Sequence, residues 1–98
     1  MEASKAFGLA IRKLRIAKGF TQEELGFESE LTRAYISSIE LDQKLPSITT
    51  IAKLAKAFDL SLSELMRLVE VELEWKPNKL KPIDILTLKA MNNLAAVY

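Results

Sequence analysis

The sequence predicts an all-α domain of five short helices, followed by a C-terminal extension with a possible short strand and a sixth helix. Apolar residues recur at spacings of three and four over most of residues 4–68, which is the period of an α-helix. Most of these stretches are bounded by Thr, Ser, Gly or Pro, which begin or end helices. At 98 residues the chain has room for one domain.

The composition argues against catalysis and against membrane insertion. The chain has no cysteine and no histidine, so it lacks thiolate chemistry, the commonest general base and the commonest metal ligand. No apolar run approaches the roughly 18 residues that cross a bilayer, and the N-terminal MEASKAFG is unlike a secretory signal. We therefore expect a protein that is not an enzyme, needs no cofactor or metal, binds no small-molecule substrate and does not enter a membrane.

The net charge of +1 is not the strongly basic balance that marks many nucleic-acid-binding proteins. Any DNA binding must therefore depend on where the charges lie. One basic cluster lies near the end of the first predicted helix: Arg12, Lys13, Arg15 and Lys18. Cations are favourable at a helix C-terminus, and the same residues could face phosphates; the two roles are compatible.

The first helix is predicted over residues 4–18. Phe7, Ile11 and Leu14 recur at spacings of four and three, so they form one apolar face. Gly19 is expected to end the helix, because glycine readily adopts the left-handed conformation of a C-cap.

The second and third helices are predicted over residues 22–29 and about 33–41. Thr21 and Glu24 form the pattern of a capping box, in which each side chain accepts a hydrogen bond from the other residue's backbone N–H. Thr32 is the expected N-cap of the third helix. The inward-facing residues are Leu25 in the second helix, and Ile36 and Ile39 in the third.

The fourth and fifth helices are predicted from about residue 48 to 58 and from residue 61 onward. Pro46 prevents the third helix from continuing, and Ser47 caps the fourth. Ser61 and Glu64 form a second capping box at the fifth. The apolar set of the fourth helix is Ile48, Ile51, Leu54, Ala55 and Phe58.

The chain changes character after the fifth helix begins, and we divide it into a domain at 1–68 and an extension at 69–98. The stretch VEVELEW (69–75) alternates apolar and acidic residues, which favours a half-buried strand. It could instead continue the fifth helix or await a partner protein. A sixth helix is predicted over residues 83–97 from Ile83, Leu86, Leu88, Met91, Leu94 and Ala95.

The second and third predicted helices, with their short connection, fit a helix-turn-helix. In this motif the second helix of the pair lies in the major groove, with its N-terminal residues at the base edges. The third helix keeps an apolar inner face and offers Arg33, Ser37 and Ser38 on its other face. Gly26 would allow the two short helices to cross closely.

Residues 7–66 resemble the lambda-repressor/Cro-like (XRE) helix-turn-helix family of phage and bacterial regulators. The matching pieces are IRKLRIAKGFTQEELG, LTRAYISSIE and LPSITTIAKLAKAFDLSLSELM, in the family's order. Within the family, LTRAYISSIE is similar to the recognition helix of restriction–modification controller proteins. The resemblance implies a cytoplasmic transcriptional regulator of bacterial or phage origin. It would bind double-stranded DNA as a homodimer on a palindromic operator, control its own promoter, and block or contact RNA polymerase.

The resemblance also implies individual roles, by position. The base-reading residues would be Thr32, Arg33, Ala34 and Ser38, with Arg33 pairing with guanine. The phosphate-binding residues would be Gln22, Tyr35, Ser37, Lys44 and Thr49. Glu40 would be structural and paired with Arg15.

Two turns depart from the family pattern. Glu30 stands in the turn where glycine is usual, and Leu41 with Asp42 replaces the usual Asn-Gly after the recognition helix. The second turn must therefore be built differently, and phosphate contacts near both turns are affected.

A single module of this size reads few bases, so a two-fold dimer is expected. The predicted dimer surface consists of Leu65, Leu68, Val69, Val71 and Leu73.

Two other functions stay open. In one, the protein is an antitoxin whose segment from Val69 binds a toxin; in the other, it is an interaction module that does not bind DNA, which only the near-neutral charge supports.

Overall fold

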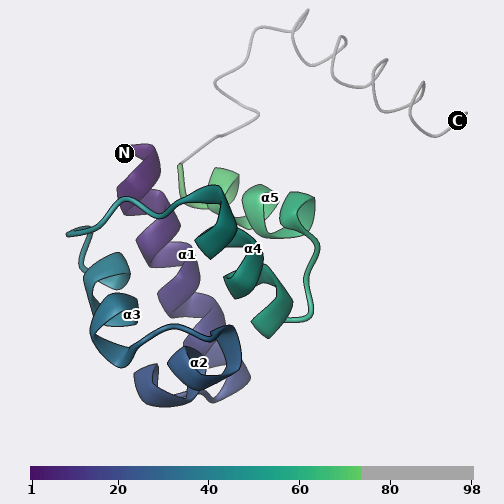
Figure 1. Ribbon diagram of the computed structural model, residues 1–98. Helices are drawn as coiled ribbons and strands as arrows, with labels where there is room; N and C mark the ends of the chain where they lie inside the picture. Colours follow the sequence, from purple (N-terminus) through teal and green to yellow (C-terminus); the bar gives the residue numbers. More distant parts are fainter. Residues whose placement is uncertain (74–98) are drawn as a thin grey trace, which may run out of the picture.

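The structure is a computed structural model, and it describes residues 1–73 (Figure 1). The described residues form five helices and no strand, which confirms the all-α prediction. α1 runs through the middle, with α3 on one side and α4 and α5 on the other (Figure 1). The helices are α1 (Ala3–Lys18), α2 (Gln22–Ser29), α3 (Arg33–Glu40), α4 (Ile48–Ala57) and α5 (Leu62–Glu72).

The predicted N-caps are all present, and they explain where four of the helices begin. The side-chain oxygens of Thr21, Thr32, Ser47 and Ser61 accept the backbone N–H three residues on, at 3.0–3.1 Å. Both capping boxes are complete, since the carboxylates of the two third-position glutamates accept from the capping residues' own N–H groups. Each cap satisfies a donor that the helix itself leaves without a partner.

The core is built from the apolar faces that the helical spacing predicted. Its largest fully buried side chains include Ile11, Leu25, Ile36, Ile39, Leu54, Phe58 and Leu65. Ile48 is an exception: it was predicted with the apolar set of α4, but it is 68% exposed. The reason is its place at the first position of α4, beyond the end of the face that packs on the core.

Two glycines allow backbones to approach closely. A Cβ added at Gly26 would lie 2.8 Å from the carbonyl oxygen of Leu31, which confirms the predicted close crossing of α2 and α3. Gly8 was not singled out from the sequence. A Cβ there would clash with the carbonyl oxygen of Ile39, so α1 and the end of α3 are in backbone contact at this point.

The strand predicted at the start of VEVELEW is wrong for the residues that the structure describes. α5 continues to Glu72, so residues 69–72 are helical. Val69 is buried one turn after Leu65, and this helical spacing places both side chains in the core. A two-residue alternation over so short a stretch does not exclude a helix, because Glu and Leu favour helices.

The proposed division of the chain at residue 68 therefore falls inside α5, and the folded domain extends at least to Glu72. Two further predictions lie outside the described residues: the end of VEVELEW at residues 74–75, and the sixth helix over residues 83–97. Within residues 1–73, no helix has the length and apolar character needed to cross a bilayer.

Candidate nucleic-acid interface

The turn between α2 and α3 is closed by Glu30, which adopts a left-handed conformation with φ 58°. Its backbone N–H caps the end of α2, and the N–H of Leu31 donates to the carbonyl of Gly26 at 2.8 Å. Glutamate therefore adopts here the left-handed conformation that glycine adopts readily, at a conformational cost of about 1–2 kcal/mol. Asp42 plays the same part after α3, with φ 59°, and aspartate tolerates this conformation better than most residues.

α3 has one buried face and one open face. Ile36 and Ile39 are buried, whereas Arg33 and Ala34 at its first turn are exposed. Thr32 is also exposed, and its hydroxyl oxygen accepts from the backbone N–H of Tyr35 at 3.0 Å. These predicted base-reading residues therefore lie together at the N-terminal end of the helix. That is the end that enters the major groove in this motif.

Ser37 and Ser38, farther along α3, are half-buried. The Ser38 hydroxyl donates to the carbonyl of Tyr35 at 2.7 Å, so its hydrogen is already used by the backbone. It keeps acceptor capacity, and it would need to rotate to donate to a base. Among the four predicted base-reading residues, Ser38 is thus the least available.

Three of the predicted phosphate-binding residues, Tyr35, Lys44 and Thr49, are considered together with the start of α4. Tyr35 is half-buried, with its hydroxyl 3.5 Å from that of Thr50, which in turn accepts from the Ser47 hydroxyl at 3.1 Å. Lys44 and Thr49 are exposed on either side of this cap. A helix N-terminus with its free N–H groups is favourable for an anion. These residues therefore fit a contact with a phosphate of the DNA backbone.

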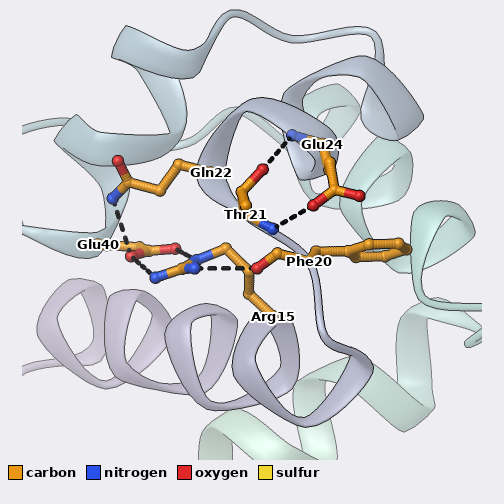
Figure 2. A network of polar contacts seen from close by, with 6 residues as sticks. All are labelled: Arg15, Phe20, Thr21, Gln22, Glu24 and Glu40. Atoms are coloured by element: carbon orange, nitrogen blue, oxygen red, sulfur yellow. Dashed lines mark hydrogen bonds and ion pairs between the residues drawn. The ribbon is translucent and has the colours of Figure 1, made fainter.

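Gln22 at the start of α2 belongs to a polar network with Glu40 and Arg15 (Figure 2). Its side-chain amide donates to Glu40 Oε1 at 3.2 Å. Glu40 also accepts from Arg15 Nε at 2.6 Å and Nη2 at 3.1 Å, which confirms the predicted pairing of Arg15 with Glu40. Arg15 Nη1 further donates to the carbonyl of Phe20 at 3.0 Å, a contact that the sequence did not indicate.

The network ties three elements together at one point: α1, the start of α2 and the end of α3. The side-chain amide of Gln22 has a second N–H beyond the one donated to Glu40. Its orientation is set by the bond to Glu40, so the buried pair holds a candidate DNA contact in place. In residues 1–73 the acidic side chains form no group of three that could hold a metal ion.

Comparison with known proteins identifies the family. A family model described as helix-turn-helix (HTH_3) matches residues 11–65, which span α2, the turn and α3. The chain belongs to this helix-turn-helix family.

Relatives within the helix-turn-helix family include controller proteins of restriction–modification systems, as the resemblance predicted. Control protein C.BamHI of Bacillus amyloliquefaciens is 38% identical over 61 residues, which are 61% of this chain and 75% of that protein. An uncharacterized HTH-type transcriptional regulator of Sinorhizobium fredii, y4dJ, is 36% identical over 66 residues, covering 67% of this chain and 86% of the relative. The solved structure of the controller protein C.AhdI from Aeromonas hydrophila matches with a TM-score of 0.61 and 44% identity, covering 63% of this chain and 94% of the other.

The five residues predicted to form the dimer surface do not share one surface in this helix-turn-helix protein. Leu65 and Val69 are buried in the chain's own core. Leu68 and Val71 are exposed on the flank of α5 that faces α1, and Leu73 lies on the opposite flank. Because residues 69–72 are helical, the five predicted residues are divided between the core and two flanks of α5.

A different apolar surface involves the residues before and at the start of α4 and one flank of α5. Leu45 and Ile48 are 81% and 68% exposed, and Met66 on α5 is 39% exposed. Leu45, Met66 and Leu73 also line a hollow of about 350 Å³. We call these three residues of the hollow, together with the exposed Ile48 three positions after Leu45 in the chain, the apolar face. The sequence indicated its apolar residues, but only the packing of α4 against α5 shows that they lie on the surface.

Proposed function

We propose that the protein is a sequence-specific DNA-binding transcriptional regulator that acts as a homodimer on a palindromic operator. The observation that carries the proposal is the open face of α3, where Thr32, Arg33 and Ala34 lie exposed at the N-terminal end. Guanidinium groups pair with guanine through two hydrogen bonds, and a methyl group can contact thymine. Helix-turn-helix relatives named as transcriptional regulators and controller proteins support the same function.

The predicted phosphate contacts support a particular orientation on DNA. Gln22 begins α2, while Lys44 and Thr49 flank the start of α4, so they lie on either side of α3 along the chain. Contacts of this kind position a protein on the duplex but carry no sequence information. We infer that they fix α3 in the groove and that Arg33 supplies most of the base preference.

The apolar face is the surface that we propose for dimerisation. Leu45 and Ile48 come directly before and within the start of α4, next to the proposed phosphate contacts. We infer that a two-fold axis passes through this face and that each copy contributes its α3 to one half-site of the operator. A group of exposed apolar side chains is typical of an interface that becomes buried on association.

The proposed mechanism is occupancy of an operator, with the dimer blocking RNA polymerase or contacting it. The similarity to controller proteins supports control of the protein's own promoter, and it supports a bacterial or phage protein acting in the cytoplasm. No step in this mechanism requires catalysis or a cofactor. The alternative is an antitoxin whose segment from Val69 binds a toxin; residues 69–72 of that segment are the last turn of α5. Co-purification of a small partner protein would favour the antitoxin, and a stable dimer alone would count against it.

Selection of bound duplexes from a randomised DNA pool, at physiological salt, tests the proposal. We expect enrichment of an inverted repeat with half-sites about one helical turn apart, roughly 34–36 Å. Binding should also weaken as salt rises, because the contacts to phosphates release counterions. If the folded protein enriches no sequence, it is not a sequence-specific regulator.

A further inference from the structure

A second apolar surface lies on the flank of α5 that the proposed dimer does not use. Leu68 and Val71 are 38% and 65% exposed there. With Ala10, Leu14 and Ala17 of α1 they line a groove of about 220 Å³. We call this the α1–α5 groove. Helical spacing places Leu68 and Val71 on the side of α5 opposite Met66 and Leu73, so one partner copy on the apolar face would leave this groove open.

The α1–α5 groove carries no net charge. Its two charged lining residues are Lys13 and Glu72, and they pair with each other at 2.7 Å between Lys13 Nζ and Glu72 Oε1. Since each neutralises the other, the groove offers little to a strongly charged ligand. The occupant that fits best is therefore an apolar segment with few charges.

The chain itself contains such a segment. We propose that residues 83–97 of the same chain pack over the α1–α5 groove. Their sequence, IDILTLKAMNNLAAV, has only two charged residues, Asp84 and Lys89, and they have opposite signs. The apolar residues that predict a helix there need a surface to bury against, and the groove supplies an apolar surface that the described residues leave exposed.

The connection is long enough for this arrangement. α5 ends at Glu72, which itself lines the groove, and Leu73, the last described residue, lies on the opposite flank of the same helix. Residues 74–82 can span up to about 30 Å when extended, whereas Ala10 to Ala17 cover about 11 Å along α1. The segment can therefore reach every part of the groove.

A tethered segment also has an advantage over a second copy. A short linker gives an effective concentration in the millimolar range, well above the micromolar concentrations at which proteins of this kind are usually handled. The covalent connection therefore favours the chain's own segment. The proposal concerns the folded chain alone, and it stands or falls independently of DNA binding.

Thiol labelling tests the proposal, because the chain has no cysteine of its own. The full-length variant Leu68→Cys would be compared with Leu62→Cys, a position on the same helix with nearly equal exposure, 38% against 40%. We expect Leu68→Cys to react with a small maleimide at least about tenfold more slowly, since each factor of ten requires only about 1.4 kcal/mol of packing free energy. Equal rates would overturn the proposal.

Two further measurements identify the occupant. Adding Leu86→Asp and Leu94→Asp to Leu68→Cys should restore rapid labelling; if the cysteine stays protected, something other than residues 83–97 covers it. Labelling is then repeated where sedimentation shows a monomer, reached by dilution or by Ile48→Lys in the apolar face. Protection that persists in the monomer supports the chain's own segment, and protection that disappears assigns the groove to a second copy.

Discussion

Arg15 and Glu40 form a bidentate ion pair that joins α1 to the end of α3. Arg15 Nε lies 2.6 Å from Glu40 Oε2, and Nη2 lies 3.1 Å from Oε1. The two side chains are only 15% and 3% exposed, so the pair is largely removed from water. Removing either residue would leave the other charge without an opposite charge in a medium that solvates it poorly, with only one neutral hydrogen-bond partner.

Removing only the arginine should therefore destabilise the protein strongly. We expect Arg15→Met to lower the free energy of unfolding by about 3–5 kcal/mol, because it strands the Glu40 carboxylate. The double variant Arg15→Met/Glu40→Leu should recover much of this loss, since no charge is left buried. Urea unfolding of the two variants and the parent measures both values. A double variant no more stable than the single one would show that the pair's own attraction is what matters.

Gly8 leads to a second prediction, opposite in sign to the usual rule. Replacing glycine by alanine inside a helix normally stabilises it by about 0.5–1 kcal/mol. At Gly8 the added methyl group would clash with the carbonyl of Ile39, so Gly8→Ala should destabilise the protein by about 1–3 kcal/mol. Lys5→Ala, at an exposed position on α1, is the control and should stay within about 0.5 kcal/mol. A stabilised Gly8→Ala variant would refute the backbone contact.

Local features of the fold could be predicted from the sequence, whereas contacts between distant residues could not. The caps at Thr21, Thr32, Ser47 and Ser61 depend on residues three apart, so the local sequence was sufficient. The Arg15–Glu40 pair came from the family resemblance, because no local pattern links residues 25 positions apart. Gly8 was missed for the same reason: its neighbour is on α3, and no spacing rule within α1 points to it.

The site was predicted less evenly than the fold. The residues at the start of α3 were placed correctly on its open face, because the apolar spacing of Ile36 and Ile39 fixes the orientation of the helix. The dimer surface depended on the structure of residues 69–73, where strand and helix patterns overlap. The exposure of Leu45 and Ile48 could not be predicted from the sequence either. Both are apolar, and only the packing of α4 shows that they lie on the surface.

The apolar face gives a third prediction, on assembly. Ile48→Lys should shift the protein toward monomer and weaken operator binding, because it places a charge in the proposed interface. Phe27→Lys is a matched control, since Phe27 is also exposed, at 81%, but lies on α2 away from this face. Sedimentation equilibrium measures the change. Equal dimer dissociation constants for the two variants would remove the apolar face as the dimer surface.

The capping box of α5 predicts a pH dependence. Hydrogen bonds from the backbone N–H of Ser61, and then from its side chain, lower the pKa of Glu64 below its ordinary value. A carboxylate whose pKa is lower in the folded state contributes stability that is present above its unfolded pKa and lost as pH falls through the folded pKa. NMR titration should show this lowered pKa, and Ser61→Ala should raise it. An unchanged pKa in Ser61→Ala would mean that the backbone bond alone is responsible.

Arg33 and Gln22 give the prediction that tests the DNA-binding surface itself. Arg33→Ala should cost about 1–3 kcal/mol on the selected operator and relax the preference at one base of each half-site. Gln22→Ala should instead weaken binding to every sequence alike, because a phosphate contact reads no base. Binding of both variants would be measured by fluorescence anisotropy on the operator and on a scrambled duplex.

Arg67→Ala is the control for the loss of one positive charge, since Arg67 is also exposed but lies on α5, away from α3. It should bind both duplexes as the parent does. Gln22 also donates to Glu40, so the unfolding free energy of Gln22→Ala must be measured to separate a lost phosphate contact from a loosened network. If Arg33→Ala keeps the parent's affinity and selectivity, then the exposed start of α3 is not the surface that reads the bases, and another face of the domain must do so.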